Sequence, residues 1–206
     1  MTWPFGDLRI FGYNVIYADP AWTFETYSEA GAGRSPQAHY DTMTVDEIAA
    51  LPVGQLAQGN AACALWVVDP LLPEGLYVLK RWGFRFATVL FTWTKEKPSG
   101  AEHIGTGYYT RANPEMCLLG ISGSMSVRDR GVRQWRHSPV WEHSRKPDEF
   151  ATDLERLFGD VPRCELFARS RRAGWDGWGF EIDGRRERIV TEPEIAPAPL
   201  FDERAA

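Results

Sequence analysis

Residues 62–68, Ala-Cys-Ala-Leu-Trp-Val-Val, are apolar without interruption, and this run constrains the fold more than any other feature. A strand with no polar position must be covered on both faces, as in the centre of a parallel or mixed sheet. Other strands are predicted at about residues 13–18, 85–93, 114–121 and 163–169, with helical segments between several of them. This alternation predicts an α/β sheet flanked by helices, in which ligands bind beyond the carboxyl ends of strands.

Capping signals predict three helices. Thr44 and Glu47 have the spacing of a capping box at the start of one helix. Asp69 is expected to cap a second helix that begins with the proline after it. A third helix is expected to open at Pro147.

Composition predicts one ordinary globular domain. The chain has 206 residues, of which 44% are hydrophobic and 25% charged, so we expect a single domain over 1–190. Residues 191–206 contain three prolines and are expected to form a flexible tail. The three cysteines lie singly in apolar runs, which predicts reduced core residues and no metal site. No signal peptide or membrane-spanning run is recognisable, so a cytoplasmic protein without membrane contact is expected.

Positive charge is concentrated in one segment of an acidic chain. The net charge is −5, yet residues 121–146 carry six basic and two acidic side chains, or +4. Arg130, Arg133 and Arg136 lie in this segment and could bind the phosphates of a nucleic acid. A solvent-exposed loop face would have the same composition, so both interpretations stay open.

The first predicted strand ends in Asp19-Pro20-Ala21-Trp22. Proline cannot donate to a sheet ladder and holds the preceding residue extended. The carboxylate of Asp19 and the carbonyl of Pro20 could accept both hydrogens of a planar amine such as that of adenine, while the ring of Trp22 stacks on the base. A strand-ending Asp-Pro turn with a packed tryptophan is the alternative.

Eight short motifs follow one another between residues 13 and 182, each weak alone and specific only as an ordered set. They are Asp19-Pro20-Ala21-Trp22, His39-Tyr40-Asp41-Thr42-Met43, Leu65-Trp66-Val67, Trp82-Gly83-Phe84, Trp93-Thr94-Lys95, Glu115-Met116-Cys117-Leu118, Ser144-Arg145-Lys146-Pro147-Asp148-Glu149 and Glu165-Leu166-Phe167-Ala168-Arg169. In this order they resemble the DPPW-type adenine-N6 methyltransferases, which include the catalytic subunit of the eukaryotic messenger-RNA enzyme and many bacterial and phage proteins.

The resemblance implies a Rossmann-like fold that binds S-adenosylmethionine, with a permuted motif order and a mixed, mostly parallel sheet flanked by helices. It implies catalytic roles for Asp19, Pro20, Ala21 and Trp22 and contacts to the target nucleic acid from Tyr40 and Lys95. The cofactor would be bound by Asp19, Lys146, Glu165, Leu166, Phe167, Arg169 and Glu181. Two positions depart from the family pattern, because Ala21 replaces a proline and Phe180 replaces an asparagine.

The expected function is therefore methyl transfer from S-adenosylmethionine to adenine N6 in nucleic acid, with DNA preferred over RNA. Three issues stay open at this point. A non-catalytic subunit of the same fold is one alternative, although such subunits lose the acid that Asp19 supplies here. Methylation of a free nucleotide or small amine is another, and it would not need the basic segment. A homodimer and a heterodimer are both compatible with the sequence.

Overall fold

The structure is a computed structural model that describes residues 3–23, 42–105, 107–140, 145–179 and 181–182. The predictions for Tyr40, Phe180 and the tail 191–206 lie outside the described residues.

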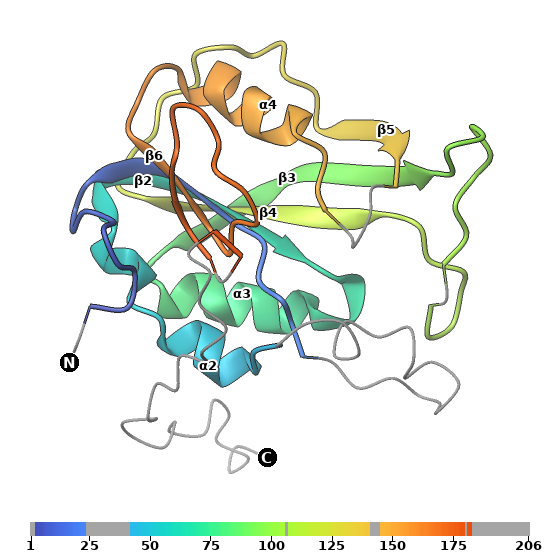
Figure 1. Cartoon of the computed structure of the whole chain (residues 1–206), viewed down its shortest axis with the longest axis horizontal. Helices are drawn as coiled ribbons and strands as arrows, with labels where there is room; N and C mark the ends of the chain where they lie inside the picture. The colour runs from blue at the N-terminus through green and yellow to red at the C-terminus, as the bar shows by residue number, and fades with distance from the viewer. Residues whose placement is uncertain (1–2, 24–41, 106, 141–144, 180, 183–206) are drawn as a thin grey trace, which may run out of the picture.

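Seven strands form a single sheet in the order β5-β3-β4-β2-β1-β6-β7 (Figure 1). Only β4 runs antiparallel to its neighbours, and the other pairs are parallel. The predicted mixed, mostly parallel sheet is therefore confirmed. The strands are β1 (Tyr13–Ala18), β2 (Ala57–Val67), β3 (Arg85–Glu96), β4 (Glu115–Ser122), β5 (Trp135–Pro139), β6 (Arg163–Leu166) and β7 (Asp176–Trp178).

Helices cover both faces of the sheet. Figure 1 shows α4 (Glu149–Phe158) on one face and α2 (Val45–Ala50) and α3 (Leu72–Arg81) on the other. Each face has its own hydrophobic core, one including residues of α2 and α3 and the other residues of α4. None of the helices in these described ranges is long and apolar enough to cross a membrane.

Strand β2 shows why the central run has no polar position. Cys63 and Leu65 point into the core shared with α2 and α3, whereas Ala64 and Trp66 point into the core shared with α4. Because successive side chains of a strand point to opposite faces, a strand between two cores must be apolar throughout. The cysteines are free and buried, as predicted, and they are Cys63, Cys117 and Cys164.

Several local predictions are confirmed and others need correction. The capping box of Thr44 and Glu47 is present at the start of α2. Asp69 does not cap α3. It lies instead in a 3-10 turn at Asp69–Leu71, and the residue at the N-cap position of α3 is Leu71, which forms no capping side-chain hydrogen bond. Strands β5 and β7 were not predicted, since both are short and polar and lie at or beside a sheet edge.

Pairing of β1 with β6, which is far from it in the sequence, creates the site. Strand β1 lies between β2 and β6, and Ala18 is in register with Leu65 on one side and Leu166 on the other. Because these strands are parallel, their carboxyl ends meet at one edge. After β1 the chain continues to β2 on one side of β1, and it forms β6 on the other side only after β3, β4 and β5, so the strand order reverses at β1. This reversal is the topological position at which open α/β sheets bind ligands.

Candidate active site

Asp19, the first residue after β1, is held by a buried lysine from a distant part of the chain. Lys146 Nζ lies 2.8 Å from Oδ1 and 2.9 Å from Oδ2 of Asp19. The side chain of Lys146 is 9% exposed and that of Asp19 is 26% exposed. The lysine therefore lies behind the carboxylate, fixes its orientation and leaves part of it open to solvent.

The ion pair continues along the edge of the sheet as a chain of alternating charges. Lys146 also lies 3.1 Å from Glu115 Oε2, and Glu115 Oε1 accepts a hydrogen bond from Lys95. The order is Asp19, Lys146, Glu115, Lys95, which we call the ion-pair chain. Sequence reasoning found the first two and the last of these residues but assigned no role to Glu115. The signal that could have found it is an acidic residue at the start of an otherwise apolar strand, which requires a buried partner.

Burial and pairing act in opposite directions on the two central members of this chain. Burial disfavours the charge on Glu115, but the ammonium groups of Lys146 and Lys95 outweigh that effect and lower the pKa of Glu115. Burial likewise disfavours the ammonium of Lys146, but the carboxylates of Asp19 and Glu115 raise the pKa of Lys146. Both side chains are therefore charged around neutral pH.

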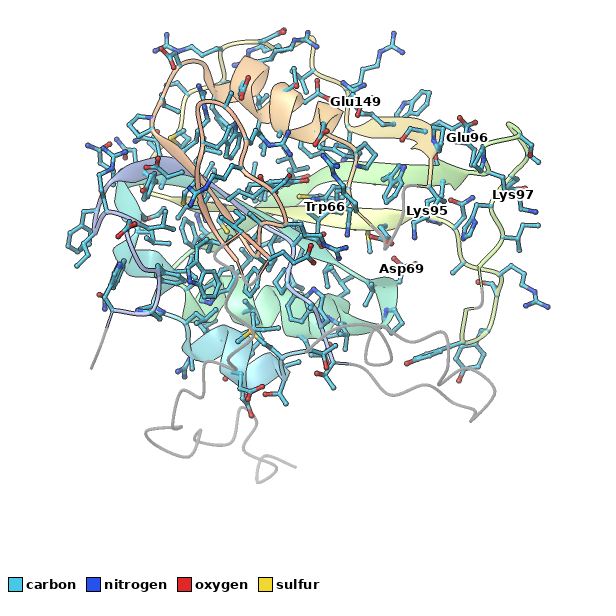
Figure 2. All side chains as sticks on the ribbon, in the orientation of Figure 1. Trp66, Asp69, Lys95, Glu96, Lys97 and Glu149 are labelled. Atoms are coloured by element: carbon cyan, nitrogen blue, oxygen red, sulfur yellow. The ribbon has the colours of Figure 1, made fainter. Side chains whose placement is uncertain are left out.

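Buried tryptophans support both lysines. Lys146 Nζ lies 5.3 Å from the ring centre of Trp66, and Lys95 Nζ lies 5.3 Å from that of Trp93. An ammonium at this distance from an indole face is stabilised by a cation–π interaction. Figure 2 labels Trp66 within the sheet and Lys95 near the carboxyl end of β3. Lys95 was expected just beyond its strand, but β3 extends to Glu96 and includes it.

The turn after Asp19 is fixed by backbone hydrogen bonds. The carbonyl of Pro20 accepts a bond of 2.9 Å from the N–H of Trp22, which leaves one of its two lone pairs for another donor. The carbonyl of Ala21 accepts a bond of 2.9 Å from the N–H of Met43, which joins the turn to the segment before α2. The second lone pair of the Pro20 carbonyl and the partly open carboxylate of Asp19 thus belong to consecutive residues of one turn.

The structure uses Trp22 differently from the prediction. Its side chain is in the core at 5% exposure, and its indole N–H donates a bond of 3.0 Å to the carbonyl of Trp66. Stacking of this ring on a substrate base is therefore incorrect for this conformation. The packed-tryptophan alternative describes the residue, because an indole with an apolar body and one donor is fully satisfied in such a place.

On the other side of Asp19, strand β6 and the turn after it form a narrow cleft. Its lining includes Asp19, Lys146, Glu165, Phe167 and Arg169, and its open volume is about 30 Å³. Four predicted cofactor-binding residues beyond Asp19 therefore meet in one place. A fifth, Leu166, has its side chain in the core at 0% exposure, so only its backbone could face a ligand. The sixth, Glu181, reaches the same region, with Oε1 3.9 Å from Nε of Arg169.

Two features of the cleft are unusual, one in its backbone and one in a carboxylate. Phe167 has a φ of +61°, a left-handed conformation that is uncommon for residues other than glycine and is enriched at binding sites. Burial raises the pKa of Glu165 although Arg172, 3.3 Å away, favours its charged form. Arg172 also lies 3.0 Å from Asp148 and therefore bridges β6 to the start of α4.

The comparisons with known proteins agree with this geometry. The sequence model of the MT-A70 family matches residues 13–181 of this chain. This chain belongs to the MT-A70 family. The resemblance stated from the motifs is therefore confirmed, and the seven-stranded sheet is the MT-A70 methyltransferase fold.

Three relatives illustrate the range of similar MT-A70 proteins. Over 200 residues the chain is 28% identical to the Type II methyltransferase M.MunI of a Mycoplasma species, which covers 89% of this chain and 83% of that protein. It is 32% identical over 207 residues to a putative N(6)-adenosine-methyltransferase MT-A70-like of Medicago truncatula, covering 94% of this chain and 32% of that one. It is 27% identical over 194 residues to the N(6)-adenosine-methyltransferase subunit METTL3 of Danio rerio, covering 92% and 31%. The chain thus spans most of the bacterial relative but about a third of the plant and fish relatives.

Two residues expected to bind nucleic acid in this MT-A70 chain have other partners. The ammonium of Lys95 is held by Glu115 and its side chain is 16% exposed, so it is not a free contact for a phosphate backbone. Arg136 pairs with Asp153, whose side chain is 1% exposed, through Nε at 2.6 Å. Of the three arginines predicted to bind phosphates, Arg130 and Arg133 are exposed.

Proposed function

We propose that this MT-A70 protein transfers a methyl group from S-adenosylmethionine to the N6 amine of adenine in nucleic acid, with DNA preferred over RNA. The main support for this proposal is the partly exposed carboxylate of Asp19, which Lys146 orients at the carboxyl edge of the sheet. The preference for DNA rests on the bacterial Type II methyltransferase among the relatives. The alignment covers 83% of that protein, against about a third of the plant and fish relatives.

The chemistry requires acceptors for both hydrogens of the adenine amine. The nitrogen lone pair is delocalised into the ring, and it becomes nucleophilic only when the amine can pyramidalise. Asp19 accepts one hydrogen and the remaining lone pair of the Pro20 carbonyl accepts the other. Preorganised polar groups of this kind contribute about 3–4 kcal/mol each to the transition state.

The cofactor supplies an activated methyl group on a positively charged sulfur. Once methylated, the amine would carry one surplus proton, which Asp19 would accept and release to solvent. Because Lys146 and the buried Glu115 hold the carboxylate in place, little reorganisation accompanies this transfer.

The residues around the cleft fit the chemical groups of S-adenosylmethionine. Carboxylates such as Glu165 can accept from an ammonium or from ribose hydroxyls, and Arg169 can bind a carboxylate, while Lys146 orients Asp19 beside them. The open volume of about 30 Å³ is much smaller than the cofactor. Binding therefore requires rotation of side chains along the cleft, and Arg172, which is 23% exposed and forms ion pairs with Asp148 and Glu165, is the side chain we expect to move.

The setting and partners follow from the same residues. Arg130 and Arg133 are exposed and would contact the phosphates of the substrate. The free, buried cysteines suit a reducing cytoplasm. A non-catalytic role is disfavoured, because the acid and its lysine are both present and joined.

The deciding experiment measures labelled methyl transfer to DNA and RNA oligonucleotides, with the product identified by nucleoside mass spectrometry. We expect N6-methyladenine from the native chain and at least a hundredfold lower rate from Asp19→Ala, in line with loss of one preorganised contact. Asp46→Ala, which removes an exposed acid in the first turn of α2, is the matched control and should keep full activity.

Three results would contradict the proposal. Equal rates for the native chain and Asp19→Ala would remove the catalytic role of the acid. No product from the native chain together with normal cofactor binding in calorimetry would favour the non-catalytic subunit. Methylation of a free nucleotide at the rate found for oligonucleotides would favour the small-substrate alternative.

A further inference from the structure

A second hollow opens at the same edge of the sheet, at the Lys95 end of the ion-pair chain. Its volume is about 450 Å³, within the usual range of ligand pockets. It lies between the start of the segment after β2 and the segment joining β3 to β4, which projects beyond the sheet in Figure 1. Figure 2 shows Asp69 and Lys95, which both line the hollow, near the carboxyl ends of β2 and β3.

Two consecutive tyrosines give this hollow its chemical character. Tyr108 is 48% exposed and Tyr109 is 101% exposed, and both line the hollow. An exposed aromatic ring that lines a hollow can stack on the flat face of a ligand. Nucleobases present such faces regardless of their identity, which makes them suitable occupants.

The segment carrying the tyrosines is anchored at its base. The side chain of Asn113 accepts a bond of 2.6 Å from the N–H of Lys95 and donates to the carbonyls of Lys95 and His103, at 2.9 and 2.7 Å. Further out, the N–H of Gly105 donates a bond of 2.7 Å to the carbonyl of Ala112. These bonds close the segment into a hairpin whose position is set by β3, so the tyrosines are presented from a fixed base.

The ion-pair chain joins the two hollows. Lys95 and Glu115 line the second hollow, while Asp19 and Lys146 line the cleft. Three consecutive ion pairs separate Asp19 from Lys95, so the two hollows are close enough for adjacent nucleotides of one strand. The exposed carboxylate of Asp69 could accept a hydrogen bond from an amino group on the edge of a base.

We propose that this second hollow binds a nucleobase that flanks the target adenine in the same strand, stacked on Tyr108 and Tyr109. The inference rests on the proposed function, since it assumes a nucleic-acid substrate. It makes the hollow a determinant of substrate choice: a single strand, or a locally opened duplex, would be required, because a paired and stacked neighbour cannot enter.

The test uses short single-stranded oligonucleotides with one adenine and the fluorescent base 2-aminopurine on its 5′ or 3′ side. Binding to the native chain should change the 2-aminopurine emission on one side only. Tyr108→Ala with Tyr109→Ala should abolish that change and weaken binding about tenfold, whereas the double phenylalanine variant should retain both, since the ring is what stacks. Phe86→Ala, an exposed aromatic at the opposite end of β3, is the matched control.

An abasic nucleotide in place of the flanking base makes the test independent of any variant. It should weaken binding to the native chain about tenfold on the side that 2-aminopurine identifies and have no further effect on the double alanine variant. The inference is overturned if the native chain binds both oligonucleotides equally. It is also overturned if the double alanine variant changes only the sedimentation coefficient, which would make the tyrosines a protein interface. Loss of methyl transfer with flank-dependent binding intact would instead contradict the proposed function alone.

Discussion

The cleft beside Asp19 and the hollow beside Tyr109 lie at one edge of the same sheet but are built on different principles. The cleft has about 30 Å³ of open volume and is lined largely by charged side chains held in ion pairs. The hollow has about 450 Å³ and presents aromatic rings on a projecting hairpin. Chemistry needs polar groups fixed in advance, whereas recognition of varied bases needs open, sequence-tolerant surfaces. Catalysis and base recognition can therefore be assigned to two separate regions at the same edge of one sheet.

The largest effect on this contrast is expected from Glu115, which lines the hollow and holds the lysine of the cleft. Glu115→Gln leaves Lys95 without its carboxylate and Lys146 with Asp19 alone. We expect the free energy of unfolding to fall by about 3 kcal/mol near neutral pH, since a buried charge pair loses one partner. Urea denaturation measures this loss. Glu102→Gln, at an exposed position of the same hairpin, should change stability by less than about 0.5 kcal/mol.

The pH dependence of that difference gives a second check. The folded pKa of Glu115 is lowered from 4.5, so its contribution is complete above 4.5 and is lost as the pH falls through the lowered value. The folded pKa of Lys146 is raised from 10.5, so its contribution is complete below 10.5 and is lost as the pH rises through the raised value. The stability difference between native chain and Glu115→Gln should therefore be flat between roughly pH 5 and 10 and shrink in acid. A difference that grows as the pH falls below 4.5 would contradict the pairing.

The basic segment repeats the contrast between fixed and open groups at a smaller scale. Arg136 is tied to the buried Asp153, whereas Arg133 is exposed three residues earlier. Arg136→Ala should lower the free energy of unfolding by about 2 kcal/mol. The loss is smaller than for a buried carboxylate left without any partner, because Arg156 stays 3.5 Å from Asp153. Thermal melting of Arg136→Ala beside Arg133→Ala measures this, and equal melting temperatures would show that the pair is not structural.

The smallest effects are expected from the exposed arginines on substrate binding. Arg130→Ala and Arg133→Ala should each weaken oligonucleotide binding a fewfold and uniformly across sequences. Each should also reduce the slope of log Kd against log salt by about one, because one phosphate contact is lost. Fluorescence anisotropy over a salt series gives both quantities. Unchanged slopes in both variants would leave the solvent-exposed loop face as the correct interpretation of this segment.

Features that depend on neighbours in the chain were predictable from the sequence. Strand β1 and its end at Asp19 follow from an apolar run before a proline, and the start of α2 follows from the spacing of Thr44 and Glu47. The ordered motifs identified the family, because each motif is a local pattern.

Charge partners were not predictable in the same way. Lys146 and Asp19 were both named as site residues, yet their direct ion pair joins positions 127 residues apart. The roles of Glu115 and Lys95 depend on the antiparallel register of β3 and β4, which places Trp93 opposite Glu115. A one-residue slip in that register would turn Glu115 to the other face.

The sequence by itself therefore determined the mixed α/β sheet, the family and the acid at the end of β1, because hydrophobic period, caps and motifs are local properties. Only the tertiary structure decided that Trp22 is buried, that Lys95 and Arg136 serve carboxylates, and that Tyr108 and Tyr109 border a hollow. The physical reason is that burial and ion pairing are set by which distant segments meet, and in what register, when the sheet forms.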